Sequence, residues 1–345
     1  MLRSIRNILL VFLFILAFYL LNILSSLLLP LVFATLVVIM YQPLMIFLRK
    51  NRFPTGVIVP IIATLTIFII LVIINIIINS VGNFAAQSDF LVSQFLKKVD
   101  AIITQVEVLT QSRLNLDNIS EYLRGLVNGE SLAKALSSVA SGLGNFGKSF
   151  FMFALYFVIL LGSMTNYKEY ISYVVKDDER FLREIESLQR SVSTYMTIKV
   201  IVSASTGLLA GIICMLFGVK FPVFFGFLTF LLNFIPSIGS IIATIPPVLM
   251  AIIQFDTYQK AIIILIILGL LQMTIGNFIE PKIMGDRLRL NTVTVIFGLV
   301  FWGIIWGIPG MLLSVPLLVI LKLILDYSDT LSVVARIMGS QRKKS

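Results

Sequence analysis

The sequence predicts an all-α polytopic membrane protein, from its composition, the length of its apolar runs and the places of its basic residues. Of its 345 residues, 58% are hydrophobic and 13% are charged, whereas soluble domains carry about 25% charged residues. Several apolar runs reach the roughly 20 residues that a helix needs to cross a bilayer. Runs of that length favour helices over the short alternating segments of a β-barrel.

Basic residues gather at the ends of apolar runs, in the groups Arg3 with Arg6, 49–52 and 342–344. This is the positive-inside distribution, which orients membrane proteins. It accounts for the net charge of +10 without a nucleic-acid partner, and it predicts that both termini are cytoplasmic.

Several chemistries are excluded by composition. The chain has no histidine and a single cysteine, Cys214, which rules out an intrachain disulfide and a Ser–His triad or histidine-based zinc centre. The stretch "GLGNFGKS" at 142–149 matches the nucleotide-binding P-loop, but no buried strand precedes it and a span follows at once. We therefore expect neither enzymatic activity nor a resident cofactor.

Apolar runs and soluble stretches divide the chain into five segments. They are a three-span N-terminal membrane segment, an extramembrane amphipathic helical segment, a span with a cytoplasmic helix, a transport core and a basic cytoplasmic tail, at 1–79, 80–148, 149–197, 198–325 and 326–345. In the first segment only Pro30 separates the runs 8–29 and 31–48, which predicts a tight hairpin there.

The extramembrane segment carries an apolar stripe at helical spacing. Its members include Leu91, Phe95, Val99, Ile102 and Val106. Such a stripe packs on another part of the chain, on the membrane surface or on a neighbouring subunit. We favour the neighbouring subunit, because the stripe is long and unpaired in the sequence, and this predicts a homo-oligomer.

The last third holds two apolar runs, 221–255 and 292–325, that are too long for one span and are interrupted near the middle. Each is either one kinked span or a hairpin that enters and leaves by the same face. The basic loop 280–291 lies inside if both are hairpins, which the positive-inside rule favours. The resulting architecture is about six full spans plus two broken re-entrant helical hairpins, with eight spans as the alternative.

Two units of opposite orientation follow from this topology, each a span with a broken hairpin. Inverted repeats with broken helices meeting at mid-membrane are typical of secondary transporters. Irregular backbone at membrane depth persists only where protein or a water-filled cavity satisfies it. The breaks therefore predict a polar binding site, with packing kinks between helices as the alternative.

Three stretches resemble the autoinducer-2 exporter (AI-2E) family of bacterial membrane proteins. They are "FLLNFIPSIGSIIATIPPVLMAII", "GNFIEPKIMG" and "WGIIWGIPGMLLSVPLLVILKLIL". The family pattern implies roles for Pro236 and Gly239, for the run from Glu280 to Gly285, and for the "G-x-x-G" ahead of Pro316. Many relatives place an aromatic residue after the first proline, where this chain has Ser237. The resemblance implies the inner membrane of a bacterium. Some members are assigned sodium–proton antiport.

The candidate residues for binding substrate or an ion are polar groups and break-forming residues in the transport core. Glu280 is an ionisable group at membrane depth, which is a functional candidate by default, although it could instead pair with Lys282. The side-chain amides of Asn233, Gln272 and Asn277 can both donate and accept hydrogen bonds, which suits a hydroxylated ligand. The alternative is that they form hydrogen bonds between helices. The binding set is Asn233, Pro236, Gly239, Gln272, Asn277, Glu280, Lys282 and Gly310, and the hinge set is Pro246, Pro281, Gly285, Gly307, Pro309 and Pro316.

The function predicted from these features is a secondary transporter or facilitator that exports a small polar molecule, by resemblance an autoinducer-2-like signal. A cation–proton antiporter working through Glu280, with Na⁺ or H⁺ as the coupling ion, is the first alternative. A membrane scaffold that transports nothing is the second. The expected partners are the lipid bilayer, a small polar substrate and further copies of the chain.

The hairpin arrangement predicts that Arg289→Cys reacts only with a reagent on the cytoplasmic side, because the loop 280–291 lies inside. The measurement is labelling with a membrane-impermeant maleimide in a Cys214→Ala background, in whole cells and in inverted vesicles. Ser237→Cys is the comparison position and should differ in access. Labelling of position 289 from outside would favour eight simple spans.

Overall fold

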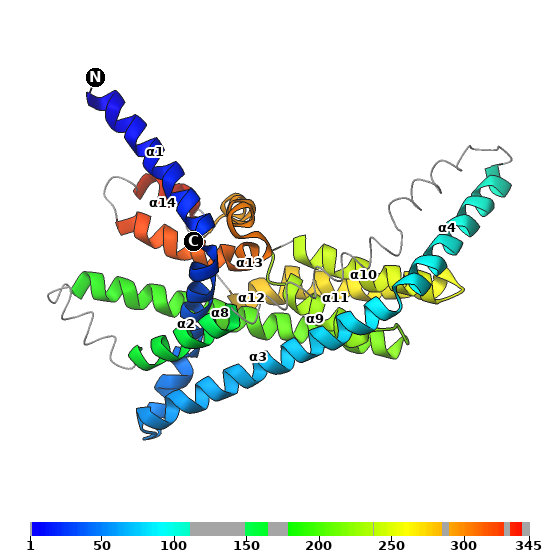
Figure 1. Cartoon of the computed structure of the whole chain (residues 1–345), viewed down its shortest axis with the longest axis horizontal. Helices are drawn as coiled ribbons and strands as arrows, with labels where there is room; N and C mark the ends of the chain where they lie inside the picture. Colours follow the sequence, from blue (N-terminus) through cyan, green and yellow to red (C-terminus); the bar gives the residue numbers. More distant parts are fainter. Residues whose placement is uncertain are drawn as a thin grey trace. The chain divides into compact units, whose positions relative to one another are not determined.

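The computed structural model describes residues 2–110, 149–164, 179–236, 238–284, 290–327 and 332–339. These residues are almost entirely helical, with one π-helical segment and one isolated β-bridge between Leu290 and Gly339 (Figure 1). The elements are α1 Leu2–Ile23, α2 Ser25–Lys50, α3 Thr55–Ala86, α4 Ser88–Thr110, a helix at Ser149–Ser163, α8 Glu179–Leu216, α9 Pro222–Leu232, α10 Ile238–Gln254, α11 Tyr258–Thr274, η1 Ile275–Ile279, α12 Glu280–Met284, α13 Thr292–Tyr327 and α14 Ser332–Met338.

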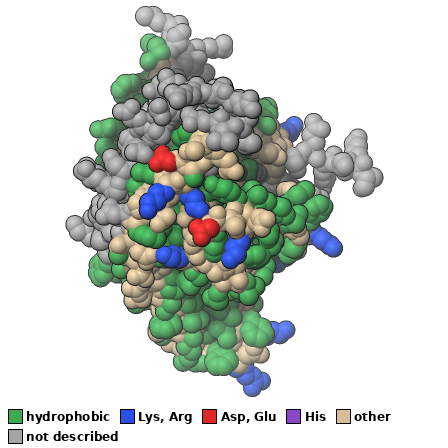
Figure 2. All heavy atoms as spheres, turned by 90° about the vertical axis from the view of Figure 1, so that its right-hand side faces the viewer, with side chains coloured by type: hydrophobic (Ala, Val, Ile, Leu, Met, Phe, Trp, Pro, Cys, Tyr) green, Lys and Arg blue, Asp and Glu red, His purple; other side chains and the backbone are tan. Residues whose placement is uncertain are grey.

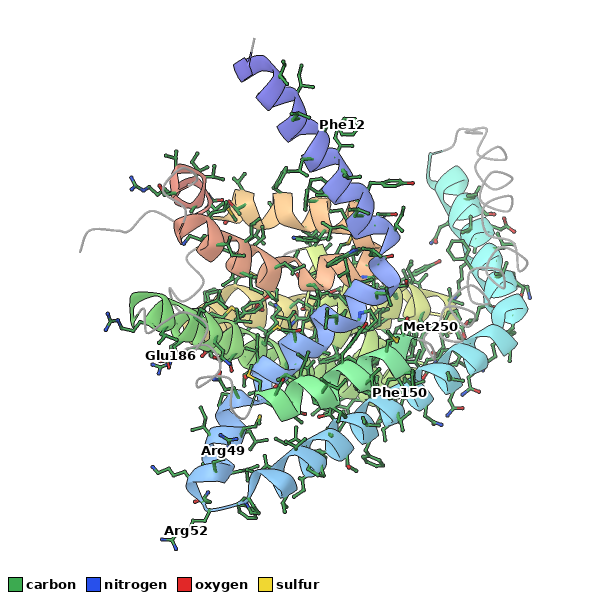
Figure 3. All side chains as sticks on the ribbon, turned by 60° about the vertical axis from the view of Figure 1, so that its left-hand side comes forward. Phe12, Arg49, Arg52, Phe150, Glu186 and Met250 are labelled. Carbon is green, nitrogen blue, oxygen red and sulfur yellow. The ribbon has the colours of Figure 1, made fainter. Side chains whose placement is uncertain are left out.

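By length and composition, five helical stretches in the described part of the chain are long and apolar enough to cross a membrane: Ser25–Lys50, Gly56–Phe84, Ile185–Leu216, Tyr258–Met284 and Thr292–Lys322. The last of them is divided at Gly307 into two shorter arms. Large apolar side chains point outward from the helices. Phe12 of α1 is 69% exposed and Ile304 of α13 is 79% exposed (Figure 3 labels Phe12). Apolar exposure on this scale suits contact with lipid tails rather than water. The prediction of an all-α polytopic membrane protein is confirmed.

The chain forms two compact units, each assembled from separate segments. The first unit comprises 1–68, 147–200 and 282–345, and the second comprises 69–146 and 201–281. The core of the first unit includes Leu36, Val192, Trp306 and Leu313. The core of the second includes Cys214, Phe225, Met250 and Ile264. The five segments expected along the sequence remain a prediction of membrane topology.

In the second unit, α9 and α10 form a helical hairpin. The Gln254 side chain at the end of α10 donates to the Gly218 carbonyl at 2.6 Å and accepts from the Lys220 N–H at 2.8 Å. The end of α10 thus returns to the start of α9. The 11 residues of α9 rise only about 16 Å, about half the thickness of a bilayer's hydrocarbon core.

In the first unit, α13 is also a hairpin, made of two arms that meet at Gly307. Gly307 has φ 63° and ψ −146°, a conformation that is essentially restricted to glycine. A methyl group added at Gly298 would strike Leu318, which lies 20 positions further along. A straight helix would separate these positions by about 30 Å. Both long apolar runs are therefore hairpins rather than single kinked helices.

Helices α8 and α9 cross with their backbones close together. A Cβ on Gly207 would lie 2.6 Å from the Gly226 carbonyl oxygen, and a Cβ on Gly226 would lie 2.7 Å from the Gly207 carbonyl oxygen. Small residues permit such close packing, which is a major source of helix association in membranes.

Helix α4 packs on the first hairpin. Leu91 is 3% exposed and belongs to the core of the second unit. Lys98 donates to the Phe255 carbonyl at 3.0 Å and lies 3.8 Å from an Asp256 carboxylate oxygen. Figure 2 faces this side of the molecule, where basic and acidic side chains lie close together. The first residue of the apolar stripe thus packs within the chain, while Val106 and the rest of the expected segment to 148 lie outside the described side chains.

One expectation about helix boundaries is wrong. Pro30 lies inside α2. Helices α1 and α2 are separated only by Leu24, and helical hydrogen bonds run across this residue, from the Leu24 N–H to the Leu20 carbonyl and from the Leu28 N–H to the Leu24 carbonyl. No hairpin forms at Pro30, because a proline ring obstructs the helix one turn before itself rather than reversing the chain. The helix expected in the segment 149–197 begins at Glu179 and continues without a break into the next apolar run, as the 38-residue α8.

The basic group at 49–52 forms the turn between α2 and α3. Arg49 and Lys50 occupy the last turn of α2, where positive charge is favourable near the negative end of the helix dipole. Arg52 has a left-handed φ of 63°, and α3 begins three residues later. Figure 3 shows Arg49 and Arg52 projecting from this turn.

We expect Gly226→Ala to lower the melting temperature, because its methyl group has no room against the α8 backbone. The cost should be about 1–3 kcal/mol, as for other overpacked cores. The buried thiol of Cys214 provides the readout through a maleimide dye that reacts on unfolding. Gly269→Ala is the control, since its Cβ meets nothing within 4 Å; equal melting temperatures for the two variants would contradict this packing.

Candidate functional site

The break in the first hairpin lies between Asn233 and Ile238. Pro236 has no N–H to offer the Leu232 carbonyl four residues earlier, and that carbonyl accepts from the Ile235 N–H at 2.9 Å instead. Gly239, in the first turn of α10, lies so close to Leu232 that a Cβ would overlap the Leu232 carbonyl. The proline and the glycine thus produce the turn together.

Asn233 ends α9 with its side chain buried, 5% exposed. Its Nδ2 donates to Ser203 Oγ of α8 at 3.0 Å. Ser203 was not among the predicted residues, yet the sequence carries a signal for it. Ser203, Gly207 and Gly211 are spaced by four, which is the small-residue pattern of close helix pairs. The structure therefore places Asn233 at a polar junction between α8 and α9.

The break in the second hairpin is satisfied from outside α13. Pro309 has no N–H for the Ile305 carbonyl four residues earlier, and Asn22 Nδ2 of α1 donates to that carbonyl at 3.0 Å. In return, Trp306 Nε1 donates to the Leu21 carbonyl at 3.0 Å. This pair of bonds ties α1 to the break, and it supports the packing interpretation for this particular carbonyl.

The two breaks use glycine in the same way. Gly310 lies so close to Trp302 that a Cβ would overlap the Trp302 carbonyl, as Gly239 does with Leu232. Each glycine begins the second arm of a hairpin and rests on a carbonyl seven or eight residues earlier. The two hairpins thus share one backbone arrangement at their turns, although they belong to different units.

A π-helical segment, η1, immediately precedes Glu280. The Glu280 N–H donates to the Ile275 carbonyl five residues earlier, where an α-helix would use the carbonyl of Gly276. Pro281 follows and cannot donate to Asn277. Single π-helical turns often occur at functional sites, so the structure adds a local distortion beside the carboxylate that the sequence singled out.

The predicted residues differ in their surroundings. Asn233, Gly239, Gln272 and Gly310 are buried, Pro236 and Glu280 are half-buried, and Asn277 and Lys282 are exposed. Gly285 lies outside the described residues. Pro246 lies within the continuous helix α10, and Pro316 lies within the second arm of α13, so neither marks a break. Of the eight predicted binding residues, Lys282 and Gly310 belong to the first unit and the other six to the second; the convergence of both breaks on one site stays a prediction.

Lys199 was not anticipated from the sequence. It is 2% exposed within the long apolar stretch of α8, whereas a lysine on a membrane helix ordinarily extends its amine toward the interface. A buried cation at membrane depth is rare and marks functional positions. One continuous helix from Glu179 carries Lys199 into the protein interior.

The helical architecture, the two broken hairpins and the apolar outer surface define a polytopic membrane protein. The chain belongs to the AI-2E transporter family, whose model matches residues 8–329. It is 28% identical to the AI-2 transport protein TqsA of Escherichia coli over 304 residues, which is 88% of this chain and 87% of that protein. It is also 28% identical to the Escherichia coli "Putative transport protein YhhT" over 328 residues, which is 94% of this chain and 90% of that protein. It is 40% identical to a "Putative transport protein" of Borreliella burgdorferi over 148 residues, which is 43% of this chain and 41% of that protein.

We expect Gly239→Val and Gly310→Val to abolish solute flux in proteoliposomes, because each side chain would overlap a backbone carbonyl at a break. Expression and elution volume in detergent should stay unchanged, since the arms outside the turns keep their contacts. Gly269→Val is the matched control with open space around its Cβ. If both break variants transport normally, the breaks are packing kinks only.

Proposed function

We propose that this protein is a secondary transporter or facilitator that exports a small polar molecule across the bacterial inner membrane, with both termini in the cytoplasm. The observation that carries the proposal is the pair of broken helical hairpins, at Pro236–Gly239 and at Gly307–Gly310, in a chain that belongs to a transporter family. Broken helices at membrane depth are the usual location of binding sites in such proteins.

The two hairpins are suited to move during transport, because their turns are compact and their arms are short. Each turn is formed by a proline and a glycine rather than by a long loop, so an arm can shift without exposing unpaired backbone to lipid. Alternating access in this class comes from movement of one bundle against another around a fixed site. We assign that movement to the two broken hairpins.

A small hydroxylated solute, such as an autoinducer-2-like signal, is the substrate class that we propose. TqsA, a relative over most of the chain, is named as an AI-2 transport protein. Asn233 and Gln272 are buried in the second unit, and carboxamides both donate to and accept from hydroxyl groups.

We also propose that the protein forms a homo-oligomer, held together by the residues of the apolar stripe of α4 that follow Leu91.

A cation–proton antiporter is the second candidate, and one observation favours it. Glu280 is half-buried and follows directly on η1, and intramembrane carboxylates are common carriers of protons and sodium ions. In this alternative, H⁺ or Na⁺ is carried at the Glu280 carboxylate and no organic solute is required.

The test is flux in proteoliposomes with and without a sodium or proton gradient. Glu280→Gln should still transport a neutral solute but should lose any dependence on the ion gradient, because the amide cannot exchange a proton. Asp256→Asn, a fully exposed carboxylate outside the proposed site, should behave like the unchanged protein. Gradient-driven ion exchange without solute flux would favour the antiporter, and no flux of any kind would favour a scaffold.

A further inference from the structure

Two groups of hydroxyls on α8 differ in how they are paired. Ser191, Ser205 and Thr206 each donate to the carbonyl four residues earlier, at 2.7–2.9 Å. This is the ordinary way for a serine or threonine to be satisfied within a helix. Ser193 and Thr197 differ, because their oxygens are buried and have no hydrogen-bond partner among the described residues.

Gln189 extends this second group by one more turn. Its Nε2 contacts Met164 Sδ at 3.4 Å, a weak acceptor, while its Oε1 is buried and has no partner among the described residues. The Gln189 and Ser193 side chains are 5% and 2% exposed. Leaving a buried polar group unpaired costs about 1–3 kcal/mol, so three such groups on one helix favour a bound molecule that pairs with them.

The three residues stand at positions i, i+4 and i+8, and we call them the α8 ladder. Residues at this spacing share one face of a helix, and successive rungs are about 6 Å apart along the axis. All three belong to the first unit. Their neighbours Val192 and Met196 lie in the apolar cluster of that unit, against which Trp302 also packs.

Trp302 packs against the same apolar cluster and carries a donor that is unpaired among the described residues. Its Nε1 is buried without a partner in the described part of the chain, whereas Nε1 of the adjacent Trp306 donates to Leu21. The two indole rings are 4.8 Å apart. Buried indole N–H groups usually find an acceptor, so Trp302 supplies an unused donor and an aromatic face beside the cluster that borders the ladder.

We propose that the α8 ladder, with Trp302, binds the hydroxyl groups of an uncharged polyol on its way through the protein. The ladder presents an amide oxygen and two hydroxyls, and none of its members is charged, which suits a neutral ligand that both donates and accepts. A single Na⁺ would bring its oxygen ligands closer together than rungs about 6 Å apart allow. The outer rungs are about 12 Å apart, so a four- or five-carbon polyol has the length and the hydroxyl groups to pair with all three, whereas glycerol is shorter and pairs with two.

The role in transport rests on the proposed function, but binding can be tested without it. Trp302 and Trp306 are the two tryptophans of the chain, so tryptophan emission reports on this region. In a Trp306→Phe background, erythritol and xylitol should change the Trp302 emission saturably. Glycerol should bind more weakly, and glycerol 3-phosphate and Na⁺ should have no effect.

Ser193→Ala and Thr197→Val should each weaken xylitol binding about tenfold, which corresponds to about 1.4 kcal/mol, and should leave the melting temperature unchanged or higher. Ser191→Ala and Thr206→Val are matched controls, because they remove hydroxyls that are already paired within α8. A saturable response that the ladder variants weaken supports the site even if no solute flux is found, in which case only the transport proposal fails. No response to any polyol, a response to Na⁺ alone, or equal affinity in ladder and control variants overturns the inference.

Discussion

The rest of this structure depends on one constraint, the need to pair every backbone group in a medium without water. Prolines in the apolar runs free carbonyls that a helix would otherwise use, and the structure shows where two of them pair. The Leu232 carbonyl takes the Ile235 N–H, and the Ile305 carbonyl takes the Asn22 side chain. Close to Pro281 the helix widens, and the Glu280 N–H reaches the Ile275 carbonyl. The breaks are therefore internally paired turns at these carbonyls rather than gaps in the bonding.

Glycine makes the same turns compact. At Gly239 and Gly310 the absence of a Cβ allows the second arm to rest on a carbonyl of the first. Gly307 adds a backbone conformation that other residues resist. The close crossing at Gly207 and Gly226 then fixes α9 against α8. Hairpins in both units thus have short turns, and their arms pack through backbone contacts that tolerate little added volume.

The sequence was sufficient for the class of fold, and prolines and glycines concentrated inside the two long apolar runs marked where the helices are interrupted. It left open whether each run is a kinked span or a hairpin, with the positive-inside rule favouring hairpins. It also located Asn233, Gly239 and Gly310, which are buried at the breaks. It failed at Pro30, because hydropathy shows where apolar residues lie but not where a helix ends. It could not supply Asn22 as the partner of Ile305, since that contact joins residues 283 positions apart. The α8 ladder was invisible because the pairing of a hydroxyl within its own helix depends on its rotamer, which no sequence pattern specifies.

These observations change which groups are available to a solute. The carbonyls at Leu232 and Ile305 already have donors, so a ligand would have to displace an internal bond to use them, and little net free energy would be gained. Side chains are different. Gln189, Ser193 and Thr197 hold buried oxygens that lack partners among the described residues, and a ligand that pairs with them displaces no bond of the protein. Taken together, our two proposals divide the labour: the broken hairpins supply shape and movement, while polar side chains on a continuous helix supply recognition. Such a division would let related chains keep the turns unchanged and alter the solute through a few positions on α8.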